Sequence, residues 1–385
     1  MNWSKSKISP TGLKPYGISF VDKLLMKHWP IYILLLLLIS TCTHIRTLLQ
    51  HTERGKYESS FPRNDSLFGL WKASHERAMA DPLQIELPYL ATIQIGHPDA
   101  SAIVYAVSVK QGQQLVAELK RPSDGTGFLL EFFNSNTTPS KKLLAELSGA
   151  SSTVEWSAHD DDSVRISLQP LLNDSAVYQV KIYTQPAYHF PVIGKDNGAI
   201  QSFWGADRDG GARRHEGIDI FAARGTPVLA VSDGRIDFAG ERGSLGGKQI
   251  WLSENKLGFR VYYAHLDSTA VHSGRQVLRG DTLGFVGNTG NAAGGPPHLH
   301  FGVYGRSGAV DPLNFVKKFA IPPDWEYDTL QPKALTERML LRTGPGTSYP
   351  TRLQLDKGEP VKLLAQTGKW LHVVARDTIA GFVRR

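Results

Sequence analysis

The chain has 385 residues, more than one hydrophobic core usually organises, so we expect two or three folded domains. Its 37 glycines and 22 prolines, interspersed with β-branched and aromatic residues, favour short strands and turns over long helices. Residues 1–29 carry +4 of the net charge of +7, with five lysines against one aspartate, and the rest shows no basic stripe interleaved with aromatics, so we expect no nucleic-acid partner.

The N-terminal segment predicts export and attachment to a membrane. Residues 31–40 form a short apolar run that leads to Cys42, the only cysteine of the chain. A membrane-spanning helix needs about 20 apolar residues, whereas runs of about 10–14 are typical of a signal peptide. Read from Met26, the segment resembles a bacterial lipoprotein signal in which Cys42 becomes the lipid-bearing N-terminus. An uncleaved anchor within residues 1–45 is the alternative, and either one places the rest of the chain in the cell envelope or periplasm.

Two segments precede the most informative part of the chain. Residues 46–84 are polar and irregular, and we interpret them as a linker with a short helix around residues 67–80. Residues 85–186 hold seven β-type segments about ten residues apart, which is typical of a β-sandwich. Their course resembles the pre-peptidase domain of secreted bacterial hydrolases. We favour a spacer role for this domain over carbohydrate or cell-wall binding.

A pair of histidines stands out within the apolar run GGPPHLHFGVY at residues 294–304. Side chains alternate between the two faces of a strand, so His298 and His300 would project together while Leu299 and Phe301 line the other face. Such a pair can be two satisfied polar residues on a half-exposed strand. It can also be part of a metal or proton-transfer site, which requires partners elsewhere in the chain.

Two other β-type segments supply candidate partners. In HEGIDIF at 215–221, extended backbone would place His215, Gly217 and Asp219 on one face, with the glycine leaving space between the other two. In VYYAHLD at 261–267, the same alternation places His265 on the face of Tyr263. Four histidines and an aspartate on neighbouring strands are hard to explain as core residues, because the whole chain has thirteen histidines.

Zinc chemistry fits this set of side chains. Zinc takes nitrogen and oxygen ligands in a tetrahedron, and a catalytic site leaves the fourth position to water. Two histidines and one carboxylate keep the metal acidic enough to lower the pKa of water to about 7. Two further histidines can transfer protons and stabilise a developing oxyanion. An iron oxygenase also uses two histidines and one carboxylate, but its usual His-x-Asp pairing is absent and two histidines would stay unused.

The motifs of residues 190–303 together resemble the M23 family of LytM-type peptidoglycan endopeptidases. They occur in order as FPVIG at 190–194, HEGID at 215–219, GTPVLAVSDGRIDFAG at 225–240, YYAHL at 262–266, SGRQVLRGDTLGFVGNTG at 273–290 and HLHFGV at 298–303. Gly302 stands where the family frequently has glutamate. The resemblance implies a peptidase domain over residues 187–322, with a groove floored by an antiparallel sheet.

The resemblance also implies a role for each side chain of the set. The positions that match the zinc ligands are His215, Asp219 and His300. The positions that match the pair acting on the attacking water and the scissile carbonyl are His265 and His298. The implied substrate is a peptide bond in the stem or cross-bridge of bacterial peptidoglycan, with a D-alanyl–diaminopimelyl cross-link favoured over a glycine bridge. The alternative is an exported, non-catalytic M23-like regulator or a wall-binding protein. His272 and Asp281 are interpreted as surface loop residues.

The C-terminal residues 333–385 resemble the bacterial SH3-like repeat. The resemblance rests on LLRTGPGTSYPTRLQLDKGEPVKLL at 340–364, followed by GKW at 368–370 and AGFV at 380–383. It implies either cell-wall binding or a structural barrel that packs on the enzyme. The predicted fold class is therefore mainly β, with an antiparallel-sheet LytM-type peptidase domain flanked by a β-sandwich and an SH3-like β-barrel.

Overall fold

The chain divides into two compact units, Met1–Pro62 and Arg63–Arg385. The computed structural model describes residues 52–62, 64–94, 101–120, 127–135, 142–148, 151–172, 177–243, 245–322 and 335–385. The segment predicted to attach the protein to a membrane, including Cys42, lies outside the described residues. Among those described, no helix is both long enough and apolar enough to span a bilayer. The first unit contains helix α2 (Glu53–Ser59), which begins where the Thr52 hydroxyl accepts a hydrogen bond from the Gly55 amide.

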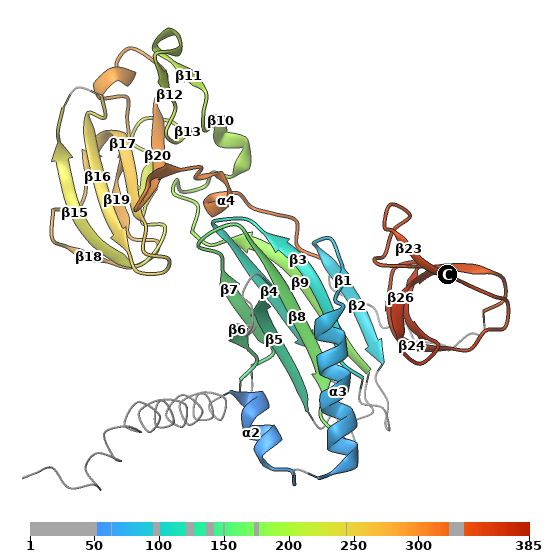
Figure 1. Ribbon diagram of the computed structural model, residues 1–385. Coiled ribbons are helices and arrows are strands. Elements are labelled where there is room, and N and C mark those ends of the chain that lie inside the picture. Colours follow the sequence, from blue (N-terminus) through green and yellow to red (C-terminus); the bar gives the residue numbers. More distant parts are fainter. Residues whose placement is uncertain are drawn as a thin grey trace, which may run out of the picture. The chain divides into compact units, whose positions relative to one another are not determined.

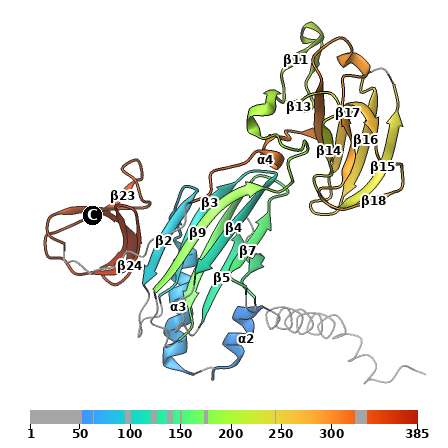
Figure 2. The same ribbon diagram turned by 180° about the vertical axis from the view of Figure 1, so that it is seen from behind.

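Helix α3 (Ser66–Ala80) confirms the helix expected around residues 67–80. It is not part of an open linker, however, because it packs against strands β3 and β8 (Figure 1 and Figure 2). Trp71 is 1% exposed, and its indole nitrogen donates a hydrogen bond of 2.9 Å to the Pro170 carbonyl. The Gln169 side chain in turn donates to the Trp71 carbonyl. Burial of a large aromatic side chain therefore fixes this part of the segment onto the sheet.

Nine strands follow α3 and form two sheets. They are β1 (Leu83–Gln84), β2 (Tyr89–Gln94), β3 (Ile103–Val109), β4 (Gln113–Lys120), β5 (Phe128–Asn134), β6 (Leu143–Glu146), β7 (Thr153–Ser157), β8 (Asp162–Pro170) and β9 (Val177–Pro186). One sheet has the order β1-β3-β8-β5-β6, and the other contains β2-β9-β4-β7. All seven predicted β-segments form strands, and the two that were not predicted, β1 and β6, are the shortest.

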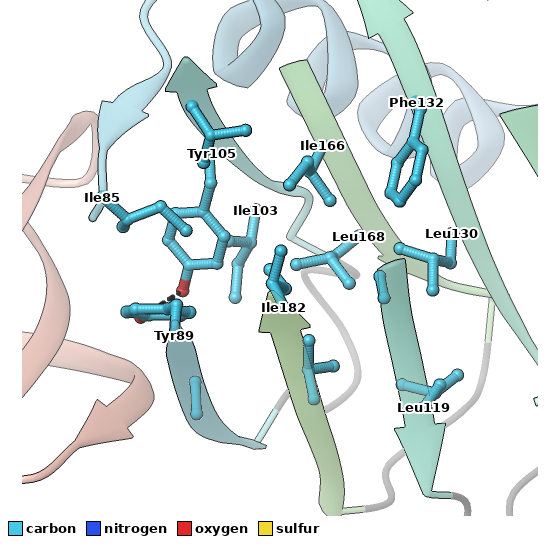
Figure 3. Close-up of a cluster of buried hydrophobic side chains, with 14 of the residues drawn as sticks. Ile85, Tyr89, Ile103, Tyr105, Leu119, Leu130, Phe132, Ile166, Leu168 and Ile182 are labelled. Atoms are coloured by element: carbon cyan, nitrogen blue, oxygen red, sulfur yellow. Dashed lines mark hydrogen bonds between the residues drawn. The ribbon is translucent and has the colours of Figure 1, made fainter. Parts of the chain in front are cut away.

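A buried apolar cluster joins these two sheets (Figure 3). Ile103, Ile166 and Leu168 come from one sheet and Ile182 from the other, and all four are essentially inaccessible to solvent. At one end of the cluster the hydroxyl groups of Tyr89 and Tyr105 are hydrogen-bonded at 3.1 Å. The buried phenols thus keep a polar partner inside an otherwise apolar core.

The last five strands extend one of these sheets. They are β22 (Met339–Arg342), β23 (Thr351–Leu355), β24 (Val361–Thr367), β25 (Trp370–Ala375) and β26 (Ile379–Arg384), in the order β23-β22-β26-β25-β24. They enclose a small core of their own around Leu341, Leu355 and Val373. Strand β24 pairs with β2, so that Ile93 lies opposite Ala365. The SH3-like assignment of this segment stays a prediction.

Between these two parts, residues 187–322 fold around a separate core. Its strands are β10 (Ile200–Ser202), β11 (Asp207–Arg208), β12 (Arg213–Arg214), β13 (Ile218–Phe221), β14 (Pro227–Leu229), β15 (Gly234–Glu241), β16 (Lys248–Glu254), β17 (Arg260–Thr269), β18 (Gln276–Val277), β19 (Thr282–Val286), β20 (His298–Gly305) and β21 (Gly308–Val310). Three 3-10 turns (Asn197–Ala199, Asp209–Gly211 and Gly290–Ala292) and the short helix α4 (Leu313–Val316) complete this part.

The main path of this sheet is β10-β13-β20-β17-β16-β15-β18, with antiparallel pairing throughout (Figure 1). Alternation sends Ile218, Val261 and Phe301 into the core, where all three are fully buried. The opposite face of β13, β20, β17, β16 and β15, called here the open face, carries the polar and aromatic side chains. The mainly β fold class is confirmed, and an antiparallel sheet lies where the resemblance implied one.

Candidate metal centre

Two adjacent strands bring an aspartate and a histidine together on the open face. Asp219 of β13 lies directly across the antiparallel ladder from His300 of β20. His298 lies opposite Phe221 in the same ladder, and its ring stacks on Phe221 with ring centroids 5.0 Å apart. The two histidines therefore share one face, as strand alternation predicts, and the cross-strand register places the carboxylate beside them.

His215 completes a triangle of possible ligand atoms. It lies just before β13 rather than within the strand, and its Nδ1 donates a hydrogen bond of 3.0 Å to the Phe203 carbonyl. Because a carbonyl can only accept, the lone pair of a neutral His215 is on Nε2. This Nε2 lies 3.0 Å from His300 Nδ1 and 3.1 Å from Asp219 Oδ1. The third side of the triangle, between His300 Nδ1 and Asp219 Oδ1, is 3.1 Å.

The triangle fits a metal ion. His215, Asp219 and His300 are the described residues whose ligand atoms converge in this way. Metal–ligand distances of about 2.0–2.1 Å in a tetrahedron require ligand atoms about 3.3 Å apart, slightly more than the spacing seen here. Two neutral imidazole nitrogens and one carboxylate oxygen also form a usual donor set for a divalent metal.

The carboxylate of Asp219 is held in its charged form. Burial raises its pKa, but the close contacts of Oδ1 with the His215 and His300 rings, each at 3.1 Å, outweigh burial and hold the pKa well below its ordinary value. The second carboxylate oxygen accepts a hydrogen bond of 2.7 Å from Arg208. The same guanidinium donates to the Ser202 hydroxyl at 2.7 Å. Arg208 therefore fixes the orientation of the carboxylate and leaves Oδ1 for the metal.

His265 reaches the same site by a route that strand alternation does not predict. The expectation that it shares a face with Tyr263 is wrong, since Tyr263 is buried in the core whereas His265 lies beside His298 with ring centroids 5.1 Å apart. The β16–β17 ladder shifts register at this point, and His265 has a φ of +61°. An irregularity of this kind inserts an extra residue and redirects the side chain to the open face.

The two remaining histidines are oriented in the same way. His265 Nδ1 donates to the Thr289 carbonyl at 2.9 Å, and His298 Nδ1 donates to the Pro296 carbonyl at 2.9 Å. Each ring therefore keeps Nε2 for proton exchange. Burial, followed by the charges of His300 and His298, lowers the pKa of His265 to about 4. His298 Nε2 is 4.0 Å from Asp219 Oδ1 and thus borders the triangle without belonging to it.

A groove of about 850 Å³ lies over these side chains. Its lining includes all five predicted site residues together with Arg208, Trp251, Tyr262 and Tyr304. The structure thus brings together all five predicted site residues. Sequence spacing did not indicate Arg208, which the β11–β12 hairpin brings to the site. Asp281 lies in a surface turn, where it accepts a hydrogen bond from the Leu278 amide, and His272 is exposed.

Gly217 is required at its position because His300 lies against it. A Cβ added there would lie 2.7 Å from His300 Cε1 and 2.6 Å from the Phe301 carbonyl oxygen. We therefore expect Gly217→Ala to displace His300 and to weaken metal binding at least tenfold, on the order of the loss caused by removing a partner of a ligand. Elemental analysis after dialysis measures the bound metal. Gly69→Ala, where an added Cβ meets nothing within 4 Å, is the control and should bind metal as the wild type does.

Comparison with known proteins points to a class for this part of the chain. Residues 213–312, which contain the whole triangle, match the family model described as Peptidase family M23. The match lies within the domain predicted for residues 187–322, so this part of the chain is similar to M23 peptidases.

The relatives are bacterial peptidases. The glycyl-glycine endopeptidase ALE-1 of Staphylococcus capitis is 40% identical over 107 residues, which is 27% of this chain and 29% of that protein. The DD-carboxypeptidase/endopeptidase Mpg of Neisseria meningitidis is 39% identical over 102 residues, 26% of this chain and 23% of that protein. The L-Ala--D-Glu endopeptidase of Bacillus subtilis is 35% identical over 130 residues, 32% of this chain and 39% of that protein. The chain thus spans less than two thirds of the length of each of these relatives.

Proposed function

We propose that the chain is a zinc-dependent endopeptidase that hydrolyses peptide cross-links or stem peptides of bacterial peptidoglycan. The observation that carries the proposal is the triangle of His215, Asp219 and His300, with two further histidines beside it in one open groove. The names of the relatives, a glycyl-glycine endopeptidase, a DD-carboxypeptidase/endopeptidase and an L-Ala--D-Glu endopeptidase, support a peptidase function.

Zinc is the metal that we propose for the triangle. Two imidazole nitrogens and one carboxylate oxygen with a fourth position open to the groove are a typical catalytic zinc arrangement. When bound, zinc supplies a Lewis acid that polarises a carbonyl group and lowers the pKa of water to about 7. The hydrogen bond from His215 Nδ1 to the Phe203 carbonyl and the ion pair between Arg208 and Asp219 orient two of the ligands.

His265 and His298 are proposed as the catalytic pair. Each holds its Nδ1 proton on a backbone carbonyl, so Nε2 is the atom that exchanges protons with the reactants. With its lowered pKa, His265 is neutral near pH 7 and can accept a proton as water attacks the carbonyl. In its protonated form either ring can stabilise the oxyanion and then pass the proton to the leaving amine.

Purified sacculi provide the test of this function. Incubation with the zinc-loaded protein should convert cross-linked muropeptides to uncross-linked products, which mass spectrometry resolves by the bond that is cut. We expect cleavage of a D-alanyl–diaminopimelyl cross-link, with a glycine bridge as the alternative substrate. A chelator should stop the release, and added zinc should restore it. Unchanged muropeptides would refute the peptidase and favour a non-catalytic, M23-like regulator.

The flanking segments are proposed to locate this enzyme. Residues 1–45 would attach it to the membrane in the cell envelope, by lipid on Cys42 or by an uncleaved anchor. Labelling with a fatty-acid analogue distinguishes the two, because only lipidation is lost in Cys42→Ala. Residues 85–186 are proposed as a β-sandwich spacer, and residues 333–385 as an SH3-like domain that binds the wall or packs on the enzyme.

A further inference from the structure

The groove over the metal centre continues across the open face of the sheet. A second hollow of about 720 Å³ lies over β17, β16 and β15. The two hollows share four lining residues, which are Leu245, Gly246, Trp251 and Tyr262. They therefore form one continuous surface, with the metal centre at one end and the turn after β15 at the other.

Aromatic side chains floor the middle of this surface. Trp251 of β16 stacks on Tyr262 of β17 with centroids 4.5 Å apart, and Tyr304 of β20 lies 5.0 Å from Trp251. Tyr262 lies opposite Gly302 in the ladder. A Cβ at Gly302 would lie 2.9 Å from the Tyr304 ring, so the absent side chain makes room for the aromatic cluster. It also leaves the floor without an acidic group at this position.

Two arginines mark the far end of the surface. The Arg260 guanidinium lies 4.8 Å above the Trp251 ring, and its Nε donates to Asp237 at 3.2 Å. The Arg242 guanidinium lies 4.7 Å above the Phe238 ring, and no described residue forms an ion pair with it. Two cationic groups thus face one carboxylate, and that carboxylate also accepts a hydrogen bond from Ser253. The end of the groove carries a net positive charge.

The turn that carries Arg242 is tied to the sheet. The side chain of Gln249, a buried residue of β16, donates a hydrogen bond of 2.5 Å to the Arg242 carbonyl. A guanidinium group above an aromatic ring can still donate from its N–H groups to an anion. Arg260 uses Nε for Asp237, which leaves its two terminal nitrogens for this purpose. Arginine is the side chain best suited to bidentate recognition of a carboxylate.

We infer that this end of the groove, formed by Phe238, Arg242, Trp251 and Arg260 and called here the arginine subsite, binds a carboxylate of the peptide substrate. The inference rests on the proposed peptidase function. From β20 at the metal centre to β15 is three strand spacings, or about 14 Å. An extended peptide covers about 3.3 Å per residue, so the carboxylate lies about four residues from the bond that is cut.

Sacculi with their carboxyl groups converted to amides test the subsite. The wild type should release muropeptides from native sacculi roughly tenfold faster than from amidated sacculi, because one charge-assisted contact is lost. In Arg242→Gln and Arg260→Gln this ratio should fall towards one. Arg260→Lys keeps the charge but loses the planar guanidinium, so its ratio should lie between those of the wild type and of Arg260→Gln. Arg279→Gln removes an exposed arginine that lines neither hollow and should keep the wild-type ratio.

Co-sedimentation with the same sacculi measures binding of the protein independently of cleavage. The wild type should sediment more with native than with amidated sacculi, and Arg242→Gln should lose that difference while retaining bound zinc. The proposed arginine subsite is refuted if the wild type cleaves both substrates equally, or if the arginine variants keep the wild-type ratio. Either result leaves the proposed peptidase function unaffected. If the wild type cleaves neither substrate, the proposed peptidase function is refuted. If the wild type then also sediments equally with both substrates, the arginine subsite is refuted as well.

Discussion

Replacement of His300 by alanine should abolish stoichiometric metal binding. His300 Nδ1 forms two of the three sides of the ligand triangle, at 3.0 and 3.1 Å from the other ligand atoms. Loss of a partner that merely orients a ligand costs about 10–100-fold in affinity, so loss of the ligand itself should cost more than about 100-fold. Elemental analysis should give about one zinc per wild-type chain and almost none for His300→Ala after dialysis.

A matched histidine variant makes this result interpretable. His272 is exposed, and its Nδ1 contacts only the neighbouring Ser273 carbonyl. His272→Ala should therefore bind zinc as the wild type does, which separates loss of a ligand from general loss of histidine. Wild-type zinc content in folded His300→Ala would contradict the assignment of this residue as a ligand.

Unlike His300→Ala, the variants His298→Ala and His265→Ala should retain the metal but lose hydrolysis. Neither ring belongs to the triangle, yet both line the groove with Nδ1 fixed on a carbonyl. Removal of a group that transfers a proton or stabilises the oxyanion typically costs about 10²–10⁴ in rate. The measurement pairs the initial rate of muropeptide release from sacculi with the zinc content of the same protein sample.

The paired readout separates the two roles. If a variant loses zinc as well as activity, the replaced histidine is a metal ligand rather than a catalytic residue. A variant that keeps both would remove its histidine from the mechanism. His272→Ala again serves as the control, with activity and zinc expected at wild-type levels.

The candidate site was predictable wherever local alternation decided the geometry. His298 and His300 share a face because β20 is regular, and Gly217 leaves the space that His300 occupies. His265 was predicted as a member of the site but on the wrong face of its strand. A register shift and a positive φ turn it, and a non-glycine residue gives no local sign of either. Arg208 was missed because a separate hairpin delivers it.

The fold shows the same division between local and non-local information. Strong alternation located seven strands before residue 187, whereas β1 and β6 are too short to give a pattern. The polar composition of residues 46–84 concealed the packing of α3, whose buried side chains are Phe68, Trp71, Ser74 and Met79. Pairing between β2 and β24 joins residues more than 250 positions apart, and no local pattern encodes such a partner.

The pairing of β24 with β2 has a consequence for solubility. Within the described sheet, β2 has β9 on one side and β24 on the other. Without the C-terminal strands, β2 would become an edge strand and expose a row of unpaired amide and carbonyl groups. It would also remove Ala365 from its place opposite Ile93, which is now fully buried. The C-terminal segment therefore protects the chain from edge-to-edge self-association, and a shortened protein that ended before residue 335 would be prone to aggregate even with its metal centre intact.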